Sequence, residues 1–156
     1  MRVARPAARV REKPLAGPTL PGRTVEISTV DLLVVGAHLS GQPLNHNLLA
    51  CKAALVGQVR TAPTYRLWAL NTVPPKPGLL RVNSAGGAIS GERWRMPAID
   101  FGALVAALPP PMTIGSVQLD DGSKVLGFLV EAAATAQARD ITAYGGWRAY
   151  LARRQP

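Results

Sequence analysis

Residues 30–45 read VDLLVVGAHLSGQPLN, and this stretch decides the fold. The segment 30–35 is almost entirely apolar, so we expect it to form a strand that is buried on both faces. The six residues 36–41 carry a glycine at each end, which is typical of a tight turn. Pro43 suits the first turn of a helix, and apolar residues at helical spacing predict that this helix runs over 43–56. The sequence thus predicts a strand, a turn and a helix in direct succession.

Most of the remaining chain has the character of β-strands. Apolar or β-branched runs bounded by turn signals predict strands at 25–29, 65–70, 79–82, 88–96, 112–119 and 124–130. Short helices are predicted at 99–108, 132–138 and 146–153, and three prolines predict a stiff loop at 74–78. One strand–helix unit followed mainly by strands predicts an α+β fold, a small mixed sheet or barrel with flanking helices. We expect one continuous mixed sheet with the 43–56 helix packed on it.

The net charge of +9 is concentrated at the ends of the chain. Residues 1–25 contain six basic side chains, one acidic side chain and four prolines, so we expect a basic, extended arm. Residues 26–152 contain ten basic and eight acidic side chains, and 153–156 form a short tail. We therefore expect one domain over 26–152, which is long enough to build its own hydrophobic core.

A domain with balanced charge is unsuited to several functions. Aromatic residues make up 5% of the chain and do not alternate with basic ones, which argues against a nucleic-acid partner. No apolar run approaches the roughly 20 residues that span a bilayer, and the first residues do not resemble a secretory signal. The single cysteine excludes an internal disulfide, so the cytoplasm is the expected compartment. Two histidines and dispersed acids show no metal-ligand spacing, so we expect neither a metal nor another cofactor.

The turn at 36–41 is the strongest candidate for a binding site. A glycine-containing turn that enters a helix directs several backbone N–H groups toward one point, and the helix dipole adds positive potential there. This arrangement favours a carboxylate or a phosphate, although neither the P-loop nor the dinucleotide-binding pattern is present. Alternatively, the two glycines are needed only for the backbone conformation of a tight turn, and the turn binds no ligand. The candidate binding residues are Gly36, Ala37, His38, Leu39, Ser40 and Gly41.

Four side chains are candidates for a role in this site. His38 is either a turn histidine bonded to the backbone or a general acid–base that acts on a substrate nitrogen. Lys76, held between two prolines, is either a solvated loop lysine or a clamp for a negatively charged substrate. Tyr65 is expected to point inward, where its hydroxyl satisfies a core group or touches the ligand. Arg81 is either a second clamp or part of a surface ion pair.

Two further residues are interpreted as structural. Glu92 stands next to Arg93 and close to Arg95, which indicates a structural salt bridge among them. Cys51 lies on the predicted helix and is interpreted as a small core residue. The segment 140–150 is interpreted as mainly structural, with a minor part in lining the site.

Four blocks of the sequence resemble the C-terminal domain of allophanate hydrolase. They are VVGAHLSGQPLN at 34–45, RTAPTYRL at 60–67, PPKPGL at 74–79 and DITAYGGWRAYL at 140–151. The resemblance implies a γ-glutamyl cyclotransferase-like fold, a small mixed barrel with helices at its side. It also implies that the loop after the first strand holds a substrate carboxylate. The catalytic acid of that wider fold group has no counterpart at 108–112, so cyclotransferase chemistry is not expected.

The resemblance also implies an activity. In allophanate hydrolase an amidase domain releases ammonia from allophanate, and the C-terminal domain decarboxylates the resulting N-carboxycarbamate. This sequence contains no amidase signature, so we expect only the second activity, on a small carboxylated nitrogen compound, with His38 moving the proton. The alternative is a non-catalytic module that binds small acids or a partner amidase, with the 1–25 arm as the docking segment.

Overall fold

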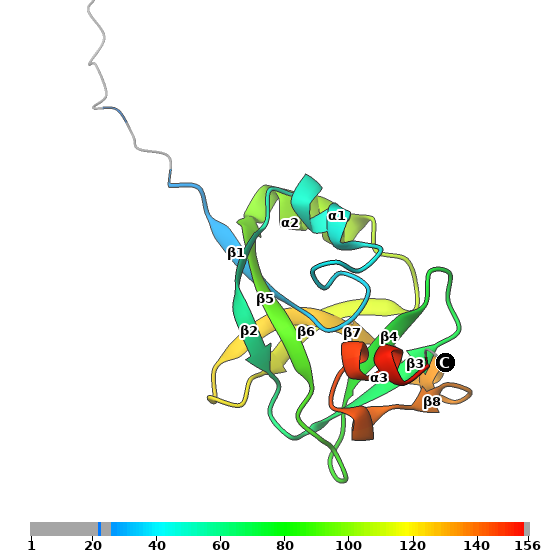
Figure 1. The fold of residues 1–156 in the computed structure, drawn as a ribbon. Helices are drawn as coiled ribbons and strands as arrows, with labels where there is room; N and C mark the ends of the chain where they lie inside the picture. The colour runs from blue at the N-terminus through cyan, green and yellow to red at the C-terminus, as the bar shows by residue number, and fades with distance from the viewer. Residues whose placement is uncertain (1–21, 23–25, 155–156) are drawn as a thin grey trace, which may run out of the picture.

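The computed structural model describes residue 22 and residues 26–154. The arm predicted at 1–25 lies outside the described residues except for Gly22, and so do the last two residues of the tail. Figure 1 shows the described chain as two sheets that pack around a common interior, with helices at their sides.

The larger sheet is built around one buried strand. Its strands, in spatial order, are β2 (Ala54–Arg60), β5 (Ser90–Pro97), β1 (Thr29–Val34), β7 (Lys124–Val130) and β6 (Met112–Gln118). β1 pairs antiparallel with β5 and parallel with β7, so it occupies the centre of the sheet. Leu32, Leu33 and Val34 have no exposed surface. This agrees with the apolar run at 30–35, because a central strand covered on both faces needs apolar residues on both.

The smaller sheet packs against the end of the larger one. Its strands, in spatial order, are β4 (Lys76–Arg81), β3 (Tyr65–Leu70) and β8 (Arg139–Asp140). Gly78 of β4 lies so close to Val130 of β7 that any side chain at position 78 would overlap the valine. Buried residues of both sheets form one hydrophobic core. The α+β prediction is confirmed, whereas the expectation of one continuous sheet is wrong, because the strands hydrogen-bond as two sheets that do not close into a barrel.

Five short helices complete the described chain. They are α1 (Asn45–Ala50), α2 (Ala98–Ala106), η1 (Ala132–Thr135), η2 (Thr142–Tyr144) and α3 (Trp147–Arg154), of which η1 and η2 are 3₁₀-helices. α1 and α2 lie beside each other at one end of the larger sheet (Figure 1). α3 buries Trp147 and Tyr150 against the core.

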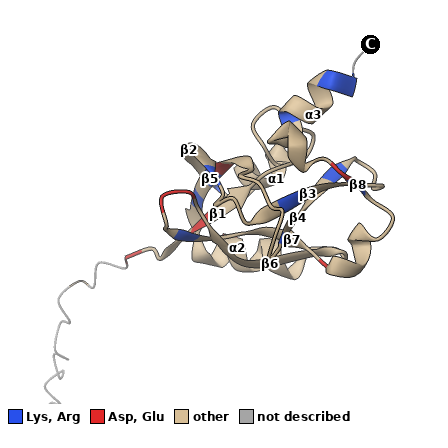
Figure 2. Ribbon diagram, turned by 90° about the horizontal axis from the view of Figure 1, so that it is seen from below, with Lys and Arg blue, Asp and Glu red and all other residues tan. Residues whose placement is uncertain are grey.

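Charged residues of both signs are distributed over the strands and helices rather than gathered on one element (Figure 2). Asp31 of β1 accepts hydrogen bonds of 2.6 Å from Arg93 and from Arg95 of the neighbouring strand β5. Arg66 of β3 lies 3.5 Å from Asp140 of β8. These ion pairs join adjacent strands, and because they are partly exposed to water each contributes about 1 kcal/mol or less.

The prediction of a helix over 43–56 is confirmed only for Asn45–Ala50. α1 ends at Ala50, and Lys52 adopts a left-handed conformation with a φ of 56°. Leu55 and Val56 belong instead to β2, which pairs antiparallel with β5. The backbone ladder with β5 outweighs the helical spacing of these apolar residues, because propensity is a weak prior against tertiary pairing.

Three other expectations differ from the structure in their boundaries. The loop expected at 74–78 ends early, since β4 begins at Lys76, and Pro77 is tolerated there because β4 is an edge strand. Of the strand expected at 25–29, only Thr29 belongs to β1 among the described residues. The helix expected at 132–138 is the single 3₁₀-turn η1.

Candidate functional site

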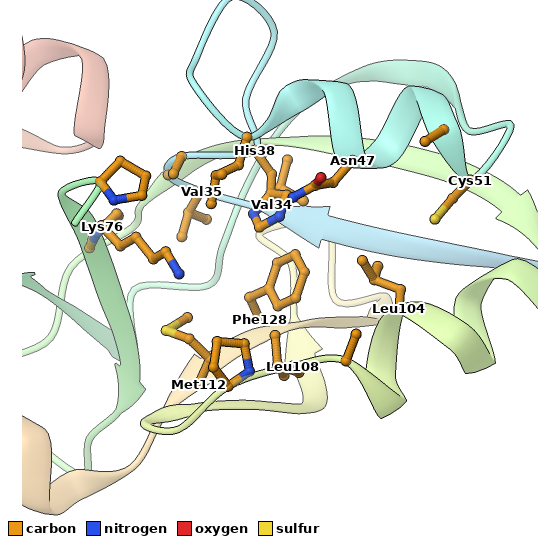
Figure 3. Close-up of a pocket in the computed structure, with 18 of the residues that line it drawn as sticks. Val34, Val35, His38, Asn47, Cys51, Lys76, Leu104, Leu108, Met112 and Phe128 are labelled. Atoms are coloured by element: carbon orange, nitrogen blue, oxygen red, sulfur yellow. The ribbon is translucent and has the colours of Figure 1, made fainter. Parts of the chain in front are cut away.

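A pocket of about 470 Å³ opens between the turn after β1, the helices α1 and α2, and the start of β4. Figure 3 shows Lys76 at one end of this pocket, His38 and Phe128 in its middle, and Cys51 and Leu104 at the far end. Its wall is mainly apolar, and its polar side chains lie toward Lys76 and His38. The pocket therefore has one charged end and one apolar end.

The turn after β1 is held by its own backbone. The N–H of Leu39 donates to the carbonyl of Gly36 at 2.9 Å, and the N–H of Leu44 donates to the carbonyl of Ala37 at 2.8 Å. Ala37 and His38 both line the pocket, and their N–H groups have no hydrogen-bond acceptor among the described residues. These two donors are therefore unused within the described residues, and a small anion is the partner that such backbone N–H groups favour where they face a cavity.

Gly36 brings the turn into contact with β4. A Cβ atom built on Gly36 would overlap the ring of Pro77, so only glycine permits this approach. Pro77 follows Lys76 directly, and Lys76 lines the same pocket as Gly36 and His38. The contact between Gly36 and Pro77 therefore positions the lysine beside the turn.

His38 is partly buried and is held on two sides. Its ring stacks on the ring of Phe128, with centroids 4.7 Å apart and planes 21° from parallel. Its carbonyl accepts a hydrogen bond of 2.9 Å from the side chain of Asn45. Burial first, and then the positive charges of Lys76 and His46, lower the pKa of His38 from 6.5 to about 4. The imidazole is therefore neutral near pH 7 while the pocket is empty.

Lys76 is the first residue of β4, and its side chain extends into the pocket (Figure 3). Neither aspartate nor glutamate occurs among the described residues that line this pocket. Its ammonium group is therefore not neutralised by a carboxylate of the wall. A cation beside a largely apolar surface attracts an anion more strongly than it would in open water, because the local dielectric is lower.

Glu92 fixes the far side of the turn. Its carboxylate has no exposed surface and accepts hydrogen bonds from the N–H and hydroxyl of Ser40, at 2.9 and 3.0 Å. It also accepts from Trp94 at 3.0 Å and from Arg148 at 2.9 Å. Burial acts to raise the pKa of Glu92, but the hydrogen bonds from Ser40, Arg148, Trp94 and Gln58 outweigh it and hold that pKa below its ordinary value. Glu92 is thus a charged anchor for the turn.

The salt bridge predicted for Glu92 exists with a different partner. Arg93 and Arg95 pair with Asp31, whereas Glu92 pairs with Arg148 of α3. Alternation along β5 explains the difference. Glu92 is buried, whereas Arg93 and Arg95 are at least partly exposed and reach Asp31 on the neighbouring strand β1. The sequence signal for this role is a single carboxylate in a strand that is otherwise largely buried. Its partners Ser40 and Arg148 could not be identified from the sequence, because they lie 52 and 56 positions away.

The structure brings together only part of the predicted site. Of the turn, Gly36, Ala37 and His38 line the pocket, and so does Lys76, whereas Leu39, Ser40 and Gly41 do not. Ser40 is turned toward Glu92 instead. Gly41 is exposed and has a φ of 77°, so it shapes the turn and leaves binding to its neighbours.

Tyr65 and Arg81 lie away from the pocket. Tyr65 is buried in the core, and its hydroxyl accepts a hydrogen bond of 2.9 Å from the N–H of Gln118. Arg81 is opposite Tyr65 in the β3–β4 ladder and is exposed. The inward direction of Tyr65 was predictable from strand alternation, but its hydroxyl satisfies a backbone group of β6.

Pattern analysis missed three side chains of the pocket. Phe128 on β7 supports the His38 ring, and Asn47 on α1 adds an amide to the polar end. Cys51 lines the apolar end, where burial raises the pKa of its thiol. No group of three or more metal-binding side chains occurs in the residues that the structure describes, and none of the helices described there is long and apolar enough to cross a membrane.

Comparison with known proteins gives this pocket a family context. A sequence model of the allophanate hydrolase C-terminal domain matches residues 30–152. The urea amidolyase of Lachancea kluyveri is 40% identical over 128 residues, which are 79% of this chain and 7% of that enzyme. The chain therefore spans about 7% of the length of this urea amidolyase.

Solved structures agree with this assignment. A protein specific to uropathogenic E. coli is 38% identical with a TM-score of 0.76, over 80% of this chain and 97% of that one. Kluyveromyces lactis allophanate hydrolase is 41% identical with a TM-score of 0.78, over 82% of this chain and 22% of that one. A gamma-glutamyl cyclotransferase, 12% identical with a TM-score of 0.50 over 72% of this chain and 70% of its own, shares the fold alone. The resemblance seen in the four sequence blocks is confirmed, and the chain belongs to the allophanate hydrolase C-terminal domain family.

Proposed function

We propose that the pocket binds a small carboxylated nitrogen compound and that the protein releases CO₂ from it, as a step in urea and allophanate breakdown. One observation carries this proposal. Lys76, Ala37 and His38 line one pocket whose described wall contains no carboxylate, and the N–H groups of Ala37 and His38 have no acceptor among the described residues. Such a wall favours an anion and disfavours a cation.

Each polar group has a distinct part in the proposed site. Lys76 and the N–H groups of Ala37 and His38 hold a carboxylate, since charge-assisted hydrogen bonds of this kind are stronger than neutral ones. Asn47 is positioned on α1 to bond to an amide or carbamate part of the ligand. The imidazole of His38 lies between Lys76 and the apolar end of the pocket (Figure 3). In this proposal it acts on the nitrogen of the bound ligand.

The proposed reaction on N-carboxycarbamate is a decarboxylation. The bond between nitrogen and one carboxylate carbon breaks, its electron pair stays on nitrogen, and one proton is taken up there. The products are CO₂ and carbamate. Negative charge develops on the nitrogen as the bond breaks, so a proton donor beside it lowers the barrier.

His38 is the proposed proton donor, although it is neutral in the empty pocket. A dianion bound beside the ring favours the imidazolium form, because an opposite charge within a few ångströms raises the pKa of a histidine. The protein therefore takes up a proton as the dianion binds. Lys76 opposes this change in the empty pocket, and its charge is neutralised once a carboxylate is bound.

Family membership supports the proposal at a coarser level. The relatives include a urea amidolyase and an allophanate hydrolase, whose names refer to the breakdown of urea and of allophanate. This chain matches 22% of the K. lactis allophanate hydrolase. That partial match favours a second candidate function, in which the domain serves a partner amidase as a non-catalytic small-acid-binding module.

Binding and turnover are tested separately. Malonate, in which CH₂ replaces the NH of N-carboxycarbamate, is a stable probe for calorimetric titration. CO₂ release is followed when allophanate is supplied together with an amidase that lacks this domain. Lys76→Met should weaken malonate binding about tenfold or more, whereas His38→Gln should slow CO₂ release more than it weakens binding.

Lys124→Met is the matched control for Lys76→Met. It changes an exposed side chain that does not line the pocket, and it should leave both measurements unchanged. A wild-type protein that binds no malonate would show that the pocket is not a site for the dianion. Malonate binding without faster CO₂ release would reject the reaction and favour the binding module.

A further inference from the structure

The apolar end of the pocket has no part in the reaction described above. Leu104 of α2 and Cys51, which follows α1, form this end. Figure 3 shows Leu104 and Cys51 on the side of the pocket opposite Lys76, with His38 and Phe128 between. The apolar end is therefore continuous with the charged end, past the histidine ring.

The size of the whole pocket exceeds that of the smallest proposed ligand. A volume of about 470 Å³ is in the range of sites that enclose ligands of drug size. N-carboxycarbamate has too few atoms to fill it and would be held at the Lys76 end alone. The apolar wall at the other end would then remain in contact with water, which is unfavourable in free energy.

The charges of the wall also set a limit on the ligand. Lys76 is the single cationic side chain among the described residues that line the pocket, apart from the titratable His38. A second carboxylate placed at the apolar end would lose its hydration without gaining a partner, which is strongly unfavourable. One carboxylate at Lys76 and an uncharged apolar group at Leu104 satisfy both ends.

We propose that the pocket selects monocarboxylates in which a ureido or carbamate nitrogen carries an apolar substituent. The carboxylate lies at Lys76 and the turn, the nitrogen-containing part lies between His38 and Asn47, and an aliphatic or aryl group lies between α1 and α2. This substrate class rests on the proposed function, because it uses the same carboxylate site.

The test is a calorimetric titration of the full chain with four probes. Malonate and N-carbamoylglycine have no apolar substituent, whereas N-propylcarbamoylglycine and N-phenylcarbamoylglycine carry one on the distal nitrogen. Affinity should rise by about threefold for each methylene that the propyl group buries, and the phenyl compound should bind at least as well as the propyl compound.

A pair of variants locates the substituent. Ala107 lines the pocket, lies three residues after Leu104 in the chain and is exposed, so we expect Ala107→Phe to fill space beside Leu104 without disturbing the core. It should abolish the gain from propyl and phenyl while leaving malonate binding unchanged. Ala106→Phe is the matched control, because Ala106 is an exposed α2 residue outside the pocket wall, and it should keep the gain.

The outcomes separate this inference from the proposed function. Equal affinity for all three ureido acids, with malonate still bound, would overturn the apolar-substituent class and leave the carboxylate site standing. A gain from propyl or phenyl that persists in Ala107→Phe would also overturn it, because the substituent would then lie elsewhere. Absence of binding by all four probes would overturn both proposals. Tight binding of the phenyl compound but not of malonate would support the inference against the dianion reaction.

Discussion

The imidazole of His38 lies flat on the ring of Phe128, with centroids 4.7 Å apart. This contact removes water from one face of the histidine, and burial is the leading cause that lowers its pKa to about 4. The same contact directs the ring edge toward the space between Lys76 and the apolar end (Figure 3). Packing and protonation are therefore coupled at this residue.

The depressed pKa of His38 makes folding sensitive to acid. The unfolded chain binds a proton near pH 6.5 and the folded chain only near about 4, so stability is complete above 6.5 and falls as the pH drops through this window. We expect a loss of about 1–3 kcal/mol from this residue across the window. Urea unfolding at several pH values should show a smaller loss for His38→Gln than for wild type. Lys124→Met, a change at an exposed site outside the pocket, should behave like wild type, and an undiminished loss in His38→Gln would contradict the assignment.

Malonate binding should strengthen as the pH is lowered from neutrality toward about 5. The complex holds a proton on His38 that the free protein does not, so proton uptake and binding are linked. Calorimetry in buffers of different ionisation enthalpy measures this uptake directly. Titration of His38→Gln corrects for the protonation of malonate itself, and equal proton uptake by the two proteins would exclude His38 as the acceptor.

Gly36→Ala should destabilise the protein by about 1–3 kcal/mol, because the added methyl group meets the ring of Pro77. Pro77→Ala in the same chain should recover a large part of this loss, as expected for two residues in contact. Gly102→Ala is the control, since nothing lies within 4 Å of the added atom. That change in the middle of α2 should stabilise by roughly 0.5–1 kcal/mol. Equal effects of the two single substitutions would show that the Gly36 contact is unimportant.

Arg148→Met should destabilise by about 1–3 kcal/mol although the arginine side chain is 45% exposed. The reason is the buried carboxylate of Glu92, which then keeps only neutral hydrogen-bond donors. Glu92→Gln in the same chain should regain part of the loss. Arg153→Met, near the end of α3 and exposed, should have almost no effect on the free energy of unfolding. A similar result for Arg148 and Arg153 would mean that the ion pair contributes nothing.

The local parts of the fold were predictable from the sequence. An apolar run predicts a strand buried on both faces wherever its partners lie, and β1 confirms this at 30–35. The turn that follows is specified by its own glycines and is also local. The prediction of a helix over 43–56 was wrong for the residues of β2. These residues form a strand because they pair with β5, which lies about forty positions later in the sequence.

The candidate site was predictable only where it is local or where family resemblance supplied it. His38 and Lys76 were both identified, but their proximity depends on the contact between Gly36 and Pro77, which no spacing reveals. For Tyr65 the sequence left two roles open, a hydrogen bond to a core group or contact with a ligand. The choice between them depends on which residues pack against the inward face of β3, and the strand pattern does not show this. Phe128 is one aromatic residue in an apolar strand, and nothing in the sequence marks it as the partner of His38.

The central position of β1 has a consequence for biosynthesis. β1 precedes the other strands of the described residues, yet its partners are β5 and β7, so Leu33 can pair with Arg93 and Gly127 only after these residues have been translated. Until residue 127 has been translated, one edge of β1 lacks its partner, and its apolar faces remain incompletely covered in the nascent chain. Such segments bind chaperones or aggregate. Ribosome-stalled chains that end before β7 should therefore be protease-sensitive, and release of a few more residues should confer protection in one step.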